Sequence, residues 1–155
     1  MGFKPARLDP PALMLTGAYF CALAIAVLMA IGGVAPLYGL AAAMGGIALA
    51  CALVAPREYV LENDGITVTR TLGSLRVEGP LEVESVSQRE LTGVRMLLGS
   101  GGLFGYLGAY RPAGVRYASA LTRRDRALLV RGEGGGVLIS PEDGDALMGL
   151  VSSRG

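Results

Sequence analysis

Histidine and tryptophan are absent from this chain of 155 residues. Without histidine, the chain lacks the commonest general base, the commonest zinc ligand and the usual pH-sensitive switch. Its only cysteines, Cys21 and Cys51, both fall within long apolar runs. The remainder therefore carries neither a disulfide framework nor a cysteine-based zinc site. We predict no catalytic residues, no metal site and no cofactor.

An excess of charge of one sign is also missing. The formal net charge is +1, and residues 57–155 contain twelve arginines and twelve acidic residues. Nucleic-acid-binding domains usually carry a basic excess on one face. We therefore predict no nucleic-acid partner. No serine, threonine or cysteine stands beside a plausible base, so nucleophilic catalysis has no support either.

Two long apolar runs near the N-terminus, at residues 11–34 and 37–54, contain no charged residue. A helix of about 20 apolar residues crosses the ~30 Å hydrocarbon core of a bilayer. We predict a short cytoplasmic tail at 1–10, a two-span transmembrane helical hairpin at 11–56 and a separate domain at 57–155. A cleaved signal peptide is the main alternative for the first run, but its apolar region would be shorter and a second run would not follow at once.

The basic residues around the two runs predict how the hairpin is oriented. Lys4 and Arg7 precede the first run, Arg57 follows the second, and the connecting turn has no charge. The positive-inside rule then places both termini in the cytoplasm and the protein in the inner, cytoplasmic membrane of the cell. The linker, Ala55-Pro56, is short enough to hold the following domain against the membrane surface.

Small residues recur every four positions along each run. Such stripes allow helix backbones to approach closely within lipid. They are consistent with packing of the two spans of one chain, or with packing between chains, which would make the protein a homo-oligomer or the partner of another membrane protein. The residues are Ala18, Ala22, Ala26 and Ala30 in the first run, and Ala42, Gly46 and Ala50 in the second, with Ala41 and Gly45 beside them.

After Arg57 the pattern changes to short β-rich segments. Asn63-Asp64-Gly65 between two such segments is a strong hairpin signal. Near the end, Ser140 and Pro141 predict the start of a short amphipathic helix. Turn residues separate strands that we predict at 58–61, 66–70, 73–78, 81–90, 105–110, 115–121, 127–131 and 137–140.

This order resembles the pleckstrin-homology-like (PH-like) superfold. The resemblance is sharpest over residues 99–110, which read Gly-Ser-Gly-Gly-Leu-Phe-Gly-Tyr-Leu-Gly-Ala-Tyr. Together with the final strand and Ser-Pro-Glu-Asp at 140–143, this segment is similar to the bacterial PH-domain families, which are often attached to two N-terminal spans. The resemblance implies a mainly-β domain of about seven antiparallel strands in a barrel or sandwich with one C-terminal helix. A few members of those families look like immunity or regulatory proteins.

The glycine-rich segment supports two interpretations. Gly102, Gly105 and Gly108 permit bulges and tight bends where a strand enters a barrel. The apolar residues around them could instead form an exposed lip that enters the leaflet or docks a neighbouring subunit. A phosphate-binding loop is excluded, because no Gly-Lys-Ser/Thr sequence ends the segment. The candidate interaction residues are Leu103, Phe104, Gly105, Tyr106 and Leu107.

A second candidate site is the basic turn of Arg123, Arg124 and Arg126. Near an anionic leaflet each arginine would contribute ~1 kcal/mol of attraction, although a solvated turn would have the same composition. The spaced basic residues that bind phosphoinositides in eukaryotic PH domains are missing, because the first hairpin reads Glu62-Asn63-Asp64-Gly65.

Taken together, these patterns predict a non-enzymatic, self-associating scaffold anchored under the inner leaflet and in contact with membrane lipids. The alternatives are a sensor that binds a lipid or small ligand, and an accessory or immunity-type regulatory subunit of a membrane complex.

Overall fold

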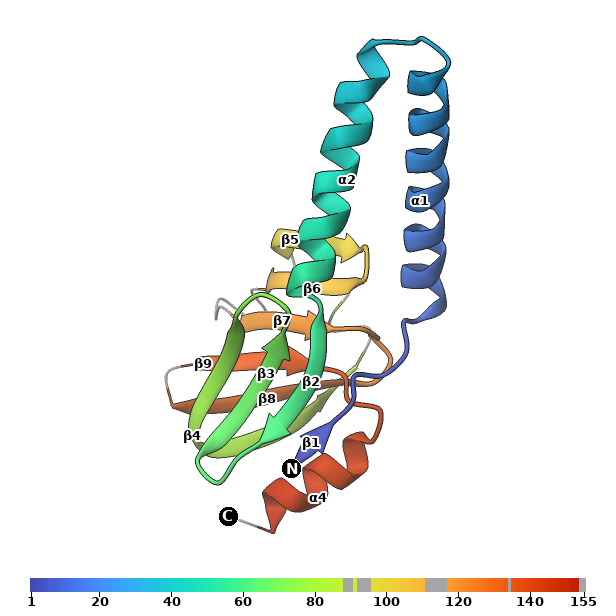
Figure 1. Cartoon of the computed structure of the whole chain (residues 1–155). Helices are drawn as coiled ribbons and strands as arrows, with labels where there is room; N and C mark the ends of the chain where they lie inside the picture. Colours follow the sequence, from blue (N-terminus) through green and yellow to red (C-terminus); the bar gives the residue numbers. More distant parts are fainter. Residues whose placement is uncertain (88–90, 92–95, 111–116, 134, 154–155) are drawn as a thin grey trace.

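The computed structural model describes residues 1–87, 91, 96–110, 117–133 and 135–153 (Figure 1). Two long helices stand side by side and project from one end of a β domain, and a short helix lies at the opposite end. The N-terminus and the C-terminal helix lie on the β domain, away from the tip of the hairpin. This arrangement confirms the predicted fold class of a helical hairpin, a mainly-β domain and a C-terminal helix.

The hairpin consists of α1 (Pro10–Ile31) and α2 (Pro36–Val54). Asp9 caps α1 by accepting a hydrogen bond from the Ala12 N–H, and prolines occupy the first turn of both helices, where no N–H donor is needed. Both helices are long and apolar enough to cross a membrane, and few of their residues are buried within the protein. Their exposed apolar surface fits a lipid environment.

The first half of the sheet contains β2 (Pro56–Leu61), β3 (Gly65–Arg70) and β4 (Ser74–Val86). The β2–β3 pair confirms the predicted hairpin. The strands predicted at 73–78 and 81–90 were wrongly separated, because β4 continues through Gly79 and Pro80. The register against β8 (Ala127–Glu133) shifts there and Gly79 has φ +89°, so these residues form a bulge instead of a turn. Residues 88–90 lie outside the described part.

The second half of the sheet contains five strands. The segment that became β5 was not predicted as a strand, because its glycines have low β-propensity. The predicted turn at 111–114 and the start of the strand predicted at 115–121 lie outside the described residues. The strands are β5 (Met96–Gly102), β6 (Gly105–Tyr110), β7 (Tyr117–Leu121), β8 (Ala127–Glu133) and β9 (Gly135–Ile139).

The N-terminal segment, predicted as a tail, contributes β1 (Gly2–Phe3) to the sheet. β1 pairs with β2, Phe3 is buried, and the terminal ammonium donates a hydrogen bond of 2.7 Å to the Leu61 carbonyl. The β domain is therefore built from chain on both sides of the hairpin. Both helices are attached to it directly.

The described strands form one sheet in the order β1-β2-β3-β4-β8-β9-β7-β6-β5, and among them only the β7–β9 pair is parallel. This order is open at both edges, so closure into a barrel is not confirmed. The main core contains side chains of β2, β3 and β4 together with β7, β8, β9 and α4 (Gly144–Ser152). Tyr59 lies at its centre, fully buried, and donates a hydrogen bond of 2.7 Å to the Ala120 carbonyl.

The C-terminal helix was predicted correctly, but its capping residue was wrong. Asp143 caps α4 by accepting a hydrogen bond of 3.2 Å from the Ala146 N–H. Ser140 is fully buried, and its hydroxyl accepts hydrogen bonds from the backbone N–H groups of Thr122 and Arg123. Ser140 therefore fixes the β7–β8 turn instead of starting a helix.

Candidate functional site

The turn between β5 and β6 has a backbone that favours glycine. Gly102 has φ +131°, Phe104 φ +56° and Gly105 φ +114°. A Cβ atom added at Gly105 would lie 2.4 Å from the carbonyl oxygen of Leu121 on β7. The glycine spacing therefore serves a tight bend and a close backbone approach, as one of the two sequence interpretations proposed.

The apolar residues of this turn do not form an exposed lip. Leu103, Tyr106 and Leu107 are buried, with exposed fractions of 7%, 2% and 3%, and Phe104 is half-buried. The exposed lip was one of the two sequence interpretations, and these side chains are covered because α1 lies against the turn. Whether the segment also contacts lipid or a second subunit remains a prediction.

Thr16 of α1 joins the helix to this turn. Its hydroxyl donates a hydrogen bond to the Gly102 carbonyl and accepts one from the Phe104 N–H, each 3.2 Å long. Beside it, the rings of Phe20 and Phe104 meet edge to face with centroids 5.8 Å apart. Both hydrogen bonds of this polar side chain in an apolar helix are therefore made to the β domain.

Asp9 is the second connection between α1 and the β domain, and it is only 6% exposed. One carboxylate oxygen accepts hydrogen bonds of 3.0 Å from the Ala12 N–H and from the Tyr106 hydroxyl. The other accepts one of 3.3 Å from the Arg124 N–H. Asp9 therefore caps α1 and ties that cap to β6 and to the β7–β8 turn.

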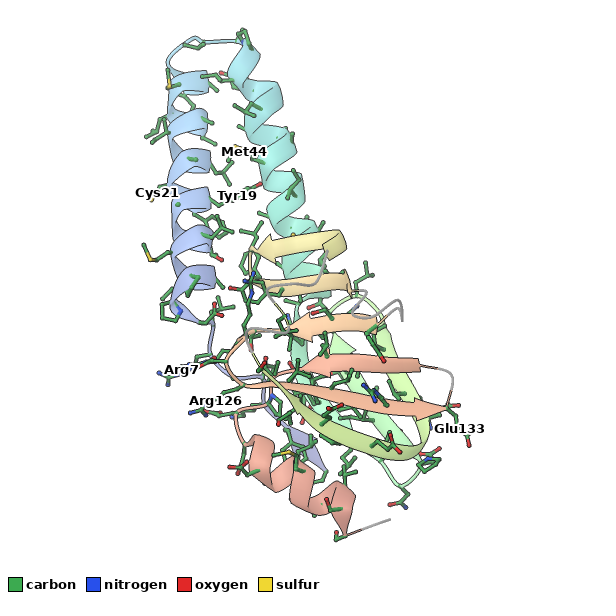
Figure 2. All side chains as sticks on the ribbon, turned by 180° about the vertical axis from the view of Figure 1, so that it is seen from behind. Arg7, Tyr19, Cys21, Met44, Arg126 and Glu133 are labelled. Carbon is green, nitrogen blue, oxygen red and sulfur yellow. The ribbon has the colours of Figure 1, made fainter. Side chains whose placement is uncertain are left out.

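The basic turn carries three arginines in three different environments. Arg123 forms a two-point ion pair with Asp125, which raises the pKa of the arginine and lowers that of the carboxyl. The Arg124 guanidinium stacks over the Tyr106 ring, 3.8 Å from its centroid. Arg126 is exposed and points outward on the same side as Arg7 (Figure 2). Of the three arginines, Arg126 is therefore the one whose side chain faces the surroundings of the protein.

We name the contact formed by Asp9, Thr16, the 102–106 turn and Arg124 the hairpin junction. Sequence reasoning identified the turn and the arginines but missed Asp9 and Thr16. A signal was present, because Asp9 precedes two prolines and an apolar run, which is a helix N-terminus pattern. The junction contains hydrogen bonds and ring packing, so it can fix the β domain to α1.

We expect Thr16→Val to weaken the junction selectively. The substitution keeps the volume but leaves the Phe104 N–H and the Gly102 carbonyl without their partner, at a cost of about 1–3 kcal/mol. Hydrogen exchange of the full chain in detergent should show faster exchange at the β5–β6 turn. Thr69→Val is the control, since the Thr69 hydroxyl bonds at an exposed position on the other half of the sheet. Equal exchange at the turn in wild type and Thr16→Val would contradict the assignment.

Within the hairpin, part of the predicted α1 stripe is buried and the predicted α2 stripe is exposed. Ala26 and Ala30 of the predicted α1 stripe are buried, but Ala18 and Ala22 are exposed. On α2 all three residues of the predicted stripe, Ala42, Gly46 and Ala50, are exposed, whereas Ala48 is buried. The Tyr19 hydroxyl, which Figure 2 shows facing α2, donates a hydrogen bond of 2.6 Å to the Met44 carbonyl. The predicted α2 stripe therefore does not form the contact between the two spans of one chain.

Among the residues that the structure describes, no group of three histidine, cysteine or carboxylate side chains is placed to hold a metal ion. Cys21 on α1 and Cys51 on α2 are not joined by a disulfide.

A family model described as a bacterial PH domain matches residues 57–155. The searches of curated proteins and of solved structures found no match. The family match covers all strands except β1, together with α4, and leaves out the two helices.

Proposed function

Because this chain belongs to the bacterial PH domain family, we propose that it is an interaction module held against the inner leaflet of the cell membrane by its helical hairpin. PH domains are generally non-catalytic interaction modules, and the apolar helices suggest membrane association. The observation that carries the proposal is the hairpin junction. It fixes the β domain to the base of α1 through named hydrogen bonds instead of leaving it on a flexible tether.

The position of the junction supports a location of the β5–β6 turn in the near leaflet. Thr16 and Phe20 contact the turn, and the remaining residues of α1 to Ile31 would extend about 17–23 Å at ~1.5 Å per residue. This length is shorter than the ~30 Å hydrocarbon core, so a hairpin that spans the core would carry the turn below the near boundary. The Phe20–Phe104 pair would then lie within the near leaflet, packed against α1.

The basic residues support the proposed orientation. Lys4, Arg7 and Arg57 all lie at the domain end of the hairpin, and the turn at its other end carries no charge. The positive-inside rule then places the β domain and both termini in the cytoplasm.

Cysteine labelling tests this placement. In a Cys21→Ala/Cys51→Ala background, Ala35→Cys lies at the tip of the hairpin and Ser153→Cys on the β domain. A membrane-impermeant maleimide should label Ala35→Cys in intact spheroplasts and Ser153→Cys only after lysis. The opposite pattern would contradict the orientation, and recovery of the chain in the soluble fraction would contradict membrane anchorage.

Self-association is part of the proposal. Ala22 on α1 and Gly46 on α2 are exposed, and nothing within 4 Å would meet a Cβ atom at Gly46. Small exposed residues at helical spacing allow close approach of a second hairpin within lipid. We expect particles extracted from native membranes in mild detergent to have a protein mass of two or more times 16.0 kDa, the mass of one chain.

The double variant Ala22→Leu/Gly46→Leu should shift these particles to the mass of one chain, because the larger side chains hold the helices apart. The control is Leu28→Phe, a change at another exposed position of α1. Wild-type particles of monomer mass would contradict self-association. Particles that contain other polypeptides would favour an accessory subunit of a larger complex.

A further inference from the structure

An open groove of about 440 Å³ lies where the last turn of α2 meets the sheet. Its walls are almost entirely apolar and come from five elements. They include Cys51 and Val54 of α2, Leu75 of β4, Leu107 of β6 and Ala118 of β7. Among the described residues, the one charged residue that lines it is Arg70, the last residue of β3.

Arg70 has no protein partner for its guanidinium among the described residues. Its Nε atom is buried without a hydrogen bond, and the ion pairs of the described chain involve Arg76, Arg123 and Arg131 instead. Burial also lowers the Arg70 pKa. Buried N–H donors are almost always paired, so an unpaired one in a groove indicates a missing acceptor. A guanidinium is best matched by a carboxylate or a phosphate.

The neighbouring β3–β4 turn indicates the position of the groove relative to the membrane surface. The Leu72 N–H donates a hydrogen bond of 2.9 Å to the Leu53 carbonyl, so the turn lies against the last turn of α2. The Leu72 side chain is 64% exposed, and no other large apolar side chain described between residues 57 and 153 is as exposed. An exposed leucine beside the end of a membrane-spanning helix suits the boundary between headgroups and acyl chains.

We propose that this groove binds one anionic phospholipid of the surrounding leaflet, with the phosphate on the Arg70 guanidinium and an acyl chain along Cys51 and Val54. The inference rests on the proposed membrane placement of α2. An apolar wall beside a single unpaired cation complements an amphiphile with one anionic group. This site differs from the basic 123–126 turn, where Arg123 and Arg124 already have partners within the chain.

The test is a titration of the detergent-purified full chain with phosphatidylglycerol, in which native mass spectrometry counts the bound lipids. Wild type should show one tight site. Arg70→Gln should weaken it by about tenfold or more, as expected for loss of a charge-assisted pair. Arg126→Gln is the matched control, since it removes an exposed arginine elsewhere, and it should leave the affinity unchanged. Equal binding by all three proteins, or equal loss in both variants, would overturn the proposal.

Further measurements identify the ligand and test whether the variants remain folded. Diacylglycerol, which lacks the phosphate, should not occupy the site, and inorganic phosphate should not displace the lipid; the reverse of either result would overturn the assignment. Val54→Phe narrows the groove while keeping Arg70, and it should also weaken binding. Lipid-free Arg70→Gln should melt no earlier than wild type, because the variant loses an unsatisfied buried group.

Membrane fractionation of the same proteins separates the two proposals. If the chain fractionates with membranes but Arg70→Gln binds lipid as wild type does, only the lipid site fails. If the chain is soluble, the proposed anchorage fails whatever the titration shows.

Discussion

Replacement of Asp9 by alanine should lower the free energy of unfolding by about 3 kcal/mol, the largest loss expected from a single polar side chain of the hairpin junction. The substitution removes an N-terminal cap, worth about 1 kcal/mol. It also leaves the Tyr106 hydroxyl and the Arg124 N–H without their charged acceptor, at about 1 kcal/mol or more each. Pulse proteolysis of the full chain in a urea series, in detergent, measures this loss.

Asp143→Ala is the matched control for this experiment. Asp143 also caps a helix, but it is exposed and accepts one hydrogen bond from the Ala146 N–H. Its loss should cost about 1 kcal/mol, the ordinary value of a cap. If the two substitutions destabilise the protein equally, Asp9 acts only as a cap and does not connect α1 to the β domain.

Tyr59 should make stability depend on pH well above neutrality. Burial raises its pKa to about 12 from the ordinary value of 10.0, because the charged phenolate is disfavoured in the core. The folded state therefore keeps a proton that the unfolded state releases. This contribution is fully present below pH ~10 and is lost as the pH rises toward ~12. The loss is about 2–3 kcal/mol, since each pKa unit corresponds to ~1.4 kcal/mol.

Tyr59→Phe isolates this effect from other groups that titrate at high pH. At neutral pH the variant should be less stable than wild type by about 1 kcal/mol, because the Ala120 carbonyl loses its donor. Between pH 10 and 12 the stability of wild type should fall toward that of the variant and then below it. A constant difference across this range, measured by urea unfolding, would show that Tyr59 keeps an ordinary pKa.

The helices and much of the sheet could be predicted from local sequence. Two charge-free runs separated by Gly32–Pro36 define the hairpin because hydropathy and helix breaking are local properties. Asn63-Asp64-Gly65 likewise predicts the β2–β3 turn from its own conformational preferences, and the structure confirms it.

The hairpin junction could not be predicted, because its residues come from separate parts of the chain. Thr16 looks unremarkable in an apolar helix until β5 and β6 bring Gly102 and Phe104 to its hydroxyl. Ser140 resembles a helix cap in sequence, but its hydroxyl accepts a hydrogen bond from the Thr122 N–H of the β7–β8 turn instead. Sequence patterns predict the hydrogen-bond partners of such side chains from residues nearby in the chain. Tertiary contacts can supply other partners, which the local pattern does not reveal.

The face through which α2 packs within the hairpin could not be chosen from composition, for a related reason. Ala41, Gly45 and Ala48 of α2 are as small as Ala42, Gly46 and Ala50, so composition alone does not distinguish the two faces. In the structure Ala48 is buried and Ala41 and Gly45 are half-buried, whereas Ala42, Gly46 and Ala50 are exposed.

The most direct test of the account is a cross-link between α1 and the β5–β6 turn in native membranes. The Phe20 and Phe104 ring centroids are 5.8 Å apart, so Phe20→Cys/Phe104→Cys in a Cys21→Ala/Cys51→Ala background places two thiols at the junction. Met29→Cys/Phe104→Cys is the control, with its helix position about 13 Å further along α1. We expect an efficient intramolecular cross-link by a short thiol reagent for the first pair and none for the second. No cross-link in the first pair, or links only between chains, would show that the β domain is not fixed to its own hairpin.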